Sequence, residues 1–145
     1  MKVQELGHVV LKVRDRDRSE RFYTEVLGLP VAARMDEYRM TFVTLGNHPD
    51  FAIIEVGTDG PDAERTSPGL FHVAFKVGNS LDELRAVKAH LEACEVAIDR
   101  TFDHTVSQSI YIADPDGNSI ELYVDTSDVW RTDPQTVATA AALVL

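Results

Sequence analysis

Apolar and polar positions along the chain follow a pattern that occurs twice. The segments LGHVVLKV at residues 6–13 and LFHVAFKV at residues 70–77 share their leucine, histidine, valine and lysine positions at an offset of 64 residues. Short apolar runs of this kind are typical of strands. Self-similarity at a fixed offset indicates an internal repeat. The sequence therefore predicts two modules of related structure.

A helix is predicted after each of these opening strands. Apolar residues stand three or four positions apart in residues 17–27 and again in residues 80–94, which is the spacing of an amphipathic helix. Gly28 follows the first helix, at a place where helices commonly end. Ser80 and Glu83 form a capping-box pattern at the start of the second helix. Both modules thus begin with a strand and a helix.

Three short runs rich in β-branched or aromatic residues follow each helix. They cover residues 29–34, 40–45, 51–56, 96–102, 109–113 and 119–124. Each half is therefore predicted to be a βαβββ module, and the fold class to be α+β. The predicted boundaries are module one at 1–57, a polar, turn-rich linker at 58–69, module two at 70–125 and a C-terminal tail at 126–145.

The tail has a weaker pattern than the modules. Its Ala-rich end predicts a helix that docks on the body of the protein or on a partner subunit. Trp130 within the tail either lines a ligand pocket or covers the core. The sequence leaves both alternatives open.

Composition narrows the function classes. A length of 145 residues fits one domain, and 44% hydrophobic with 26% charged residues is typical of a globular chain. No apolar run approaches the roughly 18 residues of a membrane span, and the N-terminal segment lacks the apolar core of a signal peptide, so we expect a cytoplasmic protein. Cys94 is the single cysteine and cannot form an internal disulfide. A net charge of -10 disfavours nucleic acid and anionic membranes, leaving small molecules as the expected partners.

Charge patterning adds one local expectation. Arginines alternate with Asp and Glu over residues 14–21, at the start of the first predicted helix. Mixed charges of this kind are typical of a solvated helix face. We therefore expect no anion site there.

The two modules carry histidine and glutamate at related places. His8 and His72 occupy the same position in the opening strands, and aligning FAIIEV with NSIELYV matches Glu55 with Glu121 at an offset of 66. Packing alone gives no reason for histidine at the same place twice. If a pseudo-twofold axis relates the modules, two imidazoles and a carboxylate meet, as in Fe(II) sites with two His and one carboxylate. The same ligand types suit Mn, Co, Ni or Zn, so the residues leave the metal open.

With this repeat, and with FYTEVLGLPV after the first strand, residues 6–124 resemble the vicinal oxygen chelate superfamily. That superfamily includes glyoxalase I, bleomycin and fosfomycin resistance proteins, and type I extradiol dioxygenases. The resemblance implies two βαβββ modules packed as a pseudo-twofold open barrel around a metal, with His8, His72 and Glu121 as ligands. Because the superfamily uses one scaffold for several reactions, the fold alone does not give the activity.

Residues 103–123, DHTVSQSIYIADPDGNSIELY, resemble the signature of the extradiol ring-cleaving dioxygenases. The matching positions are His104, Ile110, Tyr111, Asp114, Pro115, Gly117 and Glu121. The resemblance implies that His104 and Tyr111 hydrogen-bond a catecholate, that the metal is Fe(II) or Mn(II), and that the substrates are an aromatic diol and O2. A nearby His and Tyr suit this chemistry, because a catechol that chelates a metal loses protons and becomes an anion.

One segment departs from the extradiol pattern. Many of these enzymes resemble HHDLA near the end of the first module, where the second His is an acid–base group beside the oxygen site. Here His48, Pro49 and Asp50 stand in that segment. Proline has no proton to give, so either the adjacent His48 takes over as proton donor or oxygen activation is impaired.

Glyoxalase I is the rival resemblance. It implies a fourth ligand at Glu55 and a Ni, Co or Zn site that isomerises a hemithioacetal, with one Glu moving the proton. The glyoxalase pattern does not require His104 and Tyr111, and the sequence shows no evident basic cluster for the glutathione carboxylates. A third alternative is a non-catalytic binding or resistance protein of the same fold, although such proteins typically lack the metal ligands. Members of the superfamily commonly form homodimers, and we expect one here.

Overall fold

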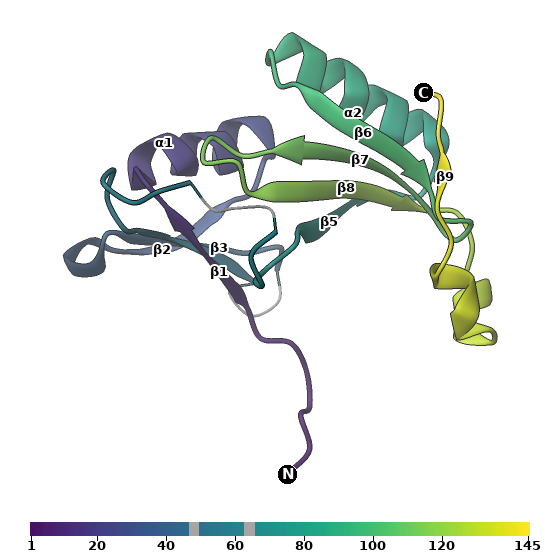
Figure 1. Ribbon diagram of the computed structural model, residues 1–145, viewed down its shortest axis with the longest axis horizontal. Coiled ribbons are helices and arrows are strands. Elements are labelled where there is room, and N and C mark those ends of the chain that lie inside the picture. Colours follow the sequence, from purple (N-terminus) through teal and green to yellow (C-terminus); the bar gives the residue numbers. More distant parts are fainter. Residues whose placement is uncertain (47–49, 63–65) are drawn as a thin grey trace. The chain divides into compact units, whose positions relative to one another are not determined.

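The computed structural model describes residues 1–46, 50–62 and 66–145. The chain divides into two compact units, Met1–Ala63 and Glu64–Leu145, and this boundary falls inside the predicted linker. Each unit contains one sheet with a helix beside it (Figure 1). The predicted α+β class and the βαβββ order of both modules are confirmed.

The first unit contains a four-stranded sheet in the order β1-β4-β3-β2. The outer strand β1 is parallel to β4, and the other neighbours are antiparallel. The strands are β1 (Val9–Val13), β2 (Val31–Met35), β3 (Met40–Val43) and β4 (Phe51–Glu55). The helical segments are α1 (Arg16–Arg21), the π-helical turn η1 (Phe22–Val26) and the 3-10 turn η2 (Asp36–Tyr38).

The first helix differs from the prediction in its second half, where α1 continues as the wider turn η1. The carboxylate of Asp15 caps the start, accepting the backbone N–H of Arg18 at 2.9 Å. Gly28 follows with φ +71°, a left-handed conformation that glycine adopts at little cost, so the predicted helix end is confirmed. The helical segment buries Tyr23, whose ring centre lies 4.8 Å from that of Phe51 in β4.

Arg16 contradicts the solvated helix face predicted for residues 14–21. Its side chain is buried, and its guanidinium donates hydrogen bonds to Asp17 and Asp36. A cation removed from water needs such partners, because its lost hydration must be replaced. Arg39, which follows η2, continues the network with ion pairs to Asp17 and Glu55. These contacts join α1, η2 and the end of β4.

The second unit repeats this topology with one strand added. Its five-stranded sheet has the order β5-β8-β7-β6-β9, with β5 parallel to β8 and the other pairs antiparallel. The strands are β5 (Val73–Gly78), β6 (Ile98–Asp103), β7 (Ser107–Ala113), β8 (Ser119–Asp125) and β9 (Ala141–Ala142). The helices are α2 (Leu81–Ala93) and the 3-10 turns η3 (Val129–Arg131) and η4 (Pro134–Val137).

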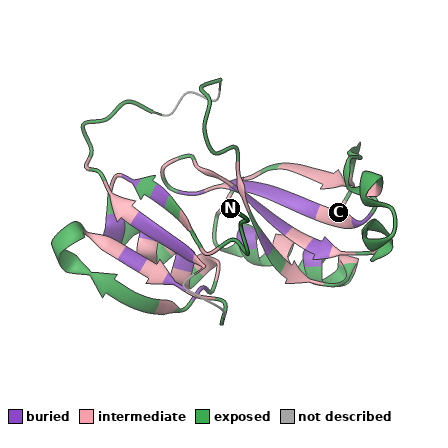
Figure 2. Cartoon of the chain, turned by 90° about the horizontal axis from the view of Figure 1, so that it is seen from below, coloured by how far each residue is buried: buried purple, intermediate pink, exposed green. Residues whose placement is uncertain are grey.

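Helix α2 begins with the predicted capping box. The Ser80 hydroxyl accepts the backbone N–H of Glu83 at 3.3 Å, and the Glu83 carboxylate accepts the backbone N–H of Asn79 at 2.8 Å. Leu84 and Leu91 of α2 are fully buried. The helix packs against β5, β7 and β8 (Figure 1), and buried residues recur along the strands of both sheets (Figure 2). In the part of the chain that the structure describes, no helix is long and apolar enough to cross a membrane.

The tail does not form the predicted helix. It contains the short turns η3 and η4, and its end forms β9, which pairs antiparallel with Phe102 and Asp103 of β6. The hydroxyl of Thr101 also donates to the carbonyl of Leu143 at 2.6 Å. The tail forms a strand here because the edge strand β6 has unpaired backbone N–H and C=O groups, which pair with the backbone of the tail.

Candidate functional site

The site is built on the face of the second sheet opposite α2. Strand pairing places Ala74 of β5 directly beside Glu121 of β8, Glu121 beside Tyr111 of β7, and Tyr111 beside Arg100 of β6. Directly paired residues of neighbouring strands point to the same face of a sheet. These four residues therefore form a transverse row across the sheet, and two of them, Tyr111 and Glu121, were predicted from the sequence.

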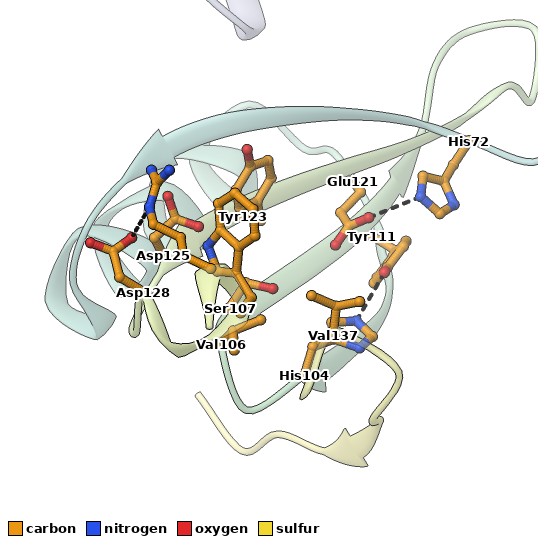
Figure 3. Close-up of a pocket in the computed structure, with 12 residues that line it drawn as sticks. His72, His104, Val106, Ser107, Tyr111, Glu121, Tyr123, Asp125, Asp128 and Val137 are labelled. Carbon is orange, nitrogen blue, oxygen red and sulfur yellow. Dashed lines mark hydrogen bonds and ion pairs between the residues drawn. The ribbon is translucent and has the colours of Figure 1, made fainter. Parts of the chain in front are cut away.

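His72 and Glu121 form the first half of the site. The Nε2 of His72 lies 2.9 Å from the Oε2 of Glu121 (Figure 3). The other carboxylate oxygen accepts a hydrogen bond from the buried Ser109 hydroxyl at 2.6 Å. The Nδ1 of His72 is buried and makes no hydrogen bond to any described residue. Ser109 thus fixes the Glu121 carboxylate so that its second oxygen and an imidazole nitrogen point to one place. This donor pair fits a transition-metal ion.

His104 and Tyr111 form the second half. The Nδ1 of His104 lies 2.6 Å from the carbonyl oxygen of Thr139. Its Nε2 lies 3.2 Å from the Tyr111 hydroxyl (Figure 3). A carbonyl can only accept, so Nδ1 carries a proton. In the neutral ring, Nε2 then accepts a hydrogen bond from the Tyr111 hydroxyl. The chain's tail therefore determines which nitrogen of His104 is available to the site.

Tyr111 is buried between the two halves. Its ring packs edge-on against His72 and Phe102, with ring centres 5.6 and 5.8 Å away. Burial and the negative charge of Glu121 raise the pKa of Tyr111 to about 12, because both disfavour the phenolate. At neutral pH Tyr111 is therefore a hydrogen-bond donor.

These side chains open into a cavity of about 510 Å³ in the second unit (Figure 3). Its floor is the sheet face described above, and its wall comes from the tail, including Val137 and Trp130. The structure thus decides between the two alternatives for Trp130, which lines the cavity. Its lining consists of His72, His104, Val106, Ser107, Tyr111, Glu121, Tyr123, Asp125, Asp128, Trp130, Arg131 and Val137.

His8 belongs to the first unit and stands immediately before β1, because this strand begins at Val9 instead of at residue 6. His72 stands immediately before β5 in the same way. The repeat therefore places the two histidines at equivalent positions of their units, as predicted. Within either unit, no three His, Cys, Asp or Glu side chains among the described residues gather to hold a metal ion. The second unit contains two of the three predicted ligands, His72 and Glu121, and the first unit contains the other, His8.

The match between Glu55 and Glu121 is wrong by three residues. Glu121 pairs with Ala74, two positions after His72, whereas the residue paired with Val10, two positions after His8, is Ala52. Ala52 is therefore the counterpart of Glu121. Because side chains alternate along a strand, Glu55 points to the opposite face from Ala52.

Both oxygens of the Glu55 carboxylate have partners. Arg39 contacts them at 3.3 and 2.9 Å, and the backbone N–H of Arg16 donates to Oε2 at 2.9 Å. These hydrogen bonds lower the pKa of Glu55, with Arg39 as the larger cause. Glu55 thus joins the end of β4 to the start of α1. The four-ligand assignment would require this carboxylate to leave both partners.

His48, the predicted proton donor, and its neighbour Pro49 lie outside the described residues. Their roles stay predictions. The structure describes Asp50 just beyond them, where its carboxylate accepts the backbone N–H of Leu45 at 2.7 Å.

Three residues of the site were missed in the sequence. Ser109 could have been found, because it stands two positions before Tyr111 and strand alternation places both on one face. Thr139 contributes a backbone carbonyl from far along the chain, so no side-chain pattern marks it. Arg100 packs its guanidinium 4.5 Å from the centre of the Tyr111 ring, and the strand pattern alone places it on the wrong face.

Comparison with known families agrees with the fold. The model of the Glyoxalase/Bleomycin resistance protein/Dioxygenase superfamily matches residues 5–122. The chain belongs to this superfamily. The predicted resemblance is therefore confirmed at the level of the family, which includes enzymes of more than one activity.

The chain is similar to proteins that are named for different activities. It is 34% identical over 133 residues to catechol-2,3-dioxygenase of Bacillus subtilis (strain 168), covering 88% of this chain but only 44% of that protein. It is 29% identical over 136 residues to lactoylglutathione lyase of Escherichia coli O157:H7, covering 87% of this chain and 96% of the relative. A solved glyoxylase/bleomycin resistance protein/dioxygenase domain from Frankia sp. EAN1pec superimposes with a TM-score of 0.72 at 25% identity, over 91% of this chain and 99% of that one.

Proposed function

We propose that the protein is a metal-dependent extradiol dioxygenase that opens the ring of a catechol-like aromatic diol with O2. The observation that carries this proposal is the hydrogen bond between His104 and Tyr111 beside the His72–Glu121 pair, all lining one cavity. A metal site needs only the pair His72 and Glu121. A site that also holds a chelated catecholate needs a hydrogen-bond donor and a proton acceptor next to the metal, and Tyr111 and His104 would supply them.

His72 through Nε2 and Glu121 through Oε2 would hold the metal, with His8 as the proposed third ligand. Fe(II) or Mn(II) bound there would supply a positive centre for two substrate oxygens and the chemistry that activates O2. Ser109 keeps the Glu121 carboxylate oriented through its 2.6 Å hydrogen bond. The proposed set contains three protein ligands, which leaves positions for both substrates.

The remaining residues act on the diol. With Nδ1 protonated against Thr139, the Nε2 of His104 would accept a proton from a substrate hydroxyl once the substrate displaces the hydrogen bond that Tyr111 donates to it. Tyr111 is a donor at neutral pH and would hydrogen-bond the resulting anion. The cleaved bond would be the ring carbon–carbon bond next to the diol, and both oxygen atoms of O2 would enter the product. His48 stays a proposed proton donor near the oxygen site.

The second candidate is a glyoxalase-like lyase, which the similarity to lactoylglutathione lyase favours. That activity would recruit Glu55 as a fourth ligand. The contacts of Glu55 with Arg39 and Arg16 count against this, since its carboxylate already has three hydrogen bonds in the first unit. We therefore place the three-ligand dioxygenase first.

Metal content is the first test. We would purify the full chain anaerobically, measure bound metals by elemental analysis, and follow oxygen uptake on a panel of catechols. The hemithioacetal of methylglyoxal and glutathione would be assayed alongside. The proposal expects about one iron or manganese per chain, oxygen uptake with a catechol, and loss of the metal in His72→Ala.

Other outcomes would overturn it. Nickel, cobalt or zinc with isomerisation of the hemithioacetal would establish the lyase. Absence of any metal and of both reactions would leave a binding protein of the same fold.

A further inference from the structure

Arg100 carries a charge on the sheet face of Tyr111 and Glu121 that the proposed mechanism does not use. It stands on β6 directly beside Tyr111, and its guanidinium carbon lies 4.5 Å from the centre of the Tyr111 ring and 6.0 Å from that of Phe71. Both distances are within the range of a cation–π contact. A stacked guanidinium keeps its N–H donors in its own plane, so they stay available to a planar anion.

A β-bulge turns Arg100 toward this face. Ile98 pairs with Ile112, and Arg100 pairs with Tyr111, so two steps on β6 match one step on β7. In a regular strand Ile98 and Arg100 would point the same way, into the core with the fully buried Ile112. The extra residue, Asp99, reverses this for Arg100. Bulges commonly redirect a side chain next to a functional site.

Among the described residues, Arg100 has no counterion. The described part of the second unit contains five Lys and Arg residues, and four of them form ion pairs, namely Lys76 with Asp125, Arg85 with Asp82, Lys88 with Glu92 and Arg131 with Asp128. Arg100 forms no ion pair with any described residue. The two acidic side chains that line the cavity beyond Glu121 are thus already paired, while this cation is not.

We infer that Arg100 binds a carboxylate on the substrate, so that the enzyme prefers an acidic catechol such as a dihydroxybenzoate over a neutral one. This inference rests on the proposed function for the position of the diol. Glu121 and Arg100 are two strands apart, so their backbones are about 10 Å apart. Arg100 is not itself a lining residue of the cavity, but its guanidinium contacts the ring of Tyr111, which is one. A substituted benzene ring whose diol lies at Glu121 would extend past Tyr111 and bring its carboxylate toward this guanidinium. In a chain of net charge -10, an acidic substrate needs such a local cation.

Binding measurements test this without turnover. We would measure the dissociation constants of 3,4-dihydroxybenzoate and 4-methylcatechol by anaerobic calorimetry on the full, metal-loaded chain. Wild type is expected to bind the carboxylate compound about 10- to 100-fold more tightly, as for a charge-assisted hydrogen-bond pair. Arg100→Gln is expected to remove this preference and leave the affinity for 4-methylcatechol unchanged.

Two further variants separate binding from structure. Arg100→Lys keeps the charge without the planar donors and is expected to restore part of the preference. Arg85→Gln removes an equal charge on α2 and is expected to keep the full preference. Equal affinities in wild type, or an equal loss for both compounds in Arg100→Gln, would overturn the inference. Oxygen uptake measured on the same samples tests the proposed function separately, because a carboxylate preference without ring cleavage would refute only the dioxygenase.

Discussion

The hydroxyl of Tyr111 is the smallest group on which the proposed chemistry depends. Removing it in Tyr111→Phe keeps the ring, its packing against His72 and the metal ligands, but deletes the donor to the substrate anion. We expect turnover to fall by on the order of 100-fold, with metal content unchanged. Oxygen uptake and elemental analysis on the same preparation would measure both.

Tyr38→Phe makes the same chemical change at an exposed tyrosine of the first unit and serves as the control. Wild-type turnover in Tyr111→Phe would remove this residue from the mechanism. A parallel loss of metal would instead assign it to the metal site.

The two glutamates of the repeat give a second prediction for single residues. Glu121→Gln removes a proposed ligand and is expected to abolish metal binding at stoichiometric metal. Glu55→Gln is expected to keep full occupancy, because the structure engages this carboxylate with Arg39 and Arg16 instead. Equilibrium dialysis against Mn(II) would compare the two, and a loss of metal in Glu55→Gln would support the four-ligand lyase.

Among the elements, α2 depends on its first turn. Ser80→Ala removes the cap that accepts the Glu83 N–H and is expected to lower the free energy of unfolding by about 1 kcal/mol. Ser80→Asp can make the same hydrogen bond and is expected to recover most of the loss. Urea denaturation followed by circular dichroism would measure both variants, and an unchanged midpoint in Ser80→Ala would mean that the capping box is not stabilising.

The ion network between α1, η2 and β4 predicts how stability responds to acid. Arg39 lowers the pKa of Glu55, and Arg16 together with Arg39 lowers that of Asp17. A carboxyl with a lowered folded pKa stabilises fully above its unfolded pKa of about 4, and this contribution is lost as the pH falls through the folded value. Stability is therefore expected to fall between about pH 5 and pH 3.

Arg39→Gln is expected to flatten this acid-side decline, because its carboxylates then titrate closer to their unfolded values. Arg21→Gln, an exposed change of the same charge on α1, is the control. Urea midpoints at several pH values would compare the variants, and identical slopes in wild type and Arg39→Gln would contradict the role given to the network.

The sequence predicted most of the regular elements. Periodicity located the strands of both modules, and Gly28 and Ser80 marked helix boundaries correctly. It failed where tertiary contacts decide the outcome. The tail pairs as a strand because β6 has a free edge, and the bulge at Asp99 turns Arg100 to the other face, which strict alternation cannot predict.

For the site, local motifs predicted correctly those side chains that lie close in sequence on adjacent strands. The segment around His104, Tyr111 and Glu121 lies on β7, β8 and the turn before them, so sequence proximity became spatial proximity. The match of Glu55 with Glu121 failed because similar letters do not fix strand register. Pairing of Val10 with Ala52 does.

At the scale of the whole molecule, the proposed ligand set takes His8 from the first unit and His72 with Glu121 from the second. His8→Ala changes a residue of the first unit but is expected to abolish metal binding as completely as His72→Ala. In wild type, Mn(II) at 100 times its dissociation constant is expected to stabilise the fold by about 2.7 kcal/mol, because only the folded chain binds it. Thermal unfolding with and without Mn(II) would show this, and an unchanged response in His8→Ala would exclude His8 as a ligand.

The expected homodimer is a second property at this scale. Light scattering at several protein concentrations would measure its mass. A monomer that still binds metal and cleaves catechol would show that one chain suffices for activity.

Ala52 gives the repeat an evolutionary meaning. Both halves keep the strand order, the helix and the histidine before the first strand. At the equivalent position of the last strand, however, the second half has the carboxylate of Glu121 and the first half has Ala52. If the halves descend from one duplicated ancestor, divergence at this single position was enough to make them unequal. The duplication then preserved the architecture twice while restricting the carboxylate to one copy, so that the two halves no longer carry the same polar groups.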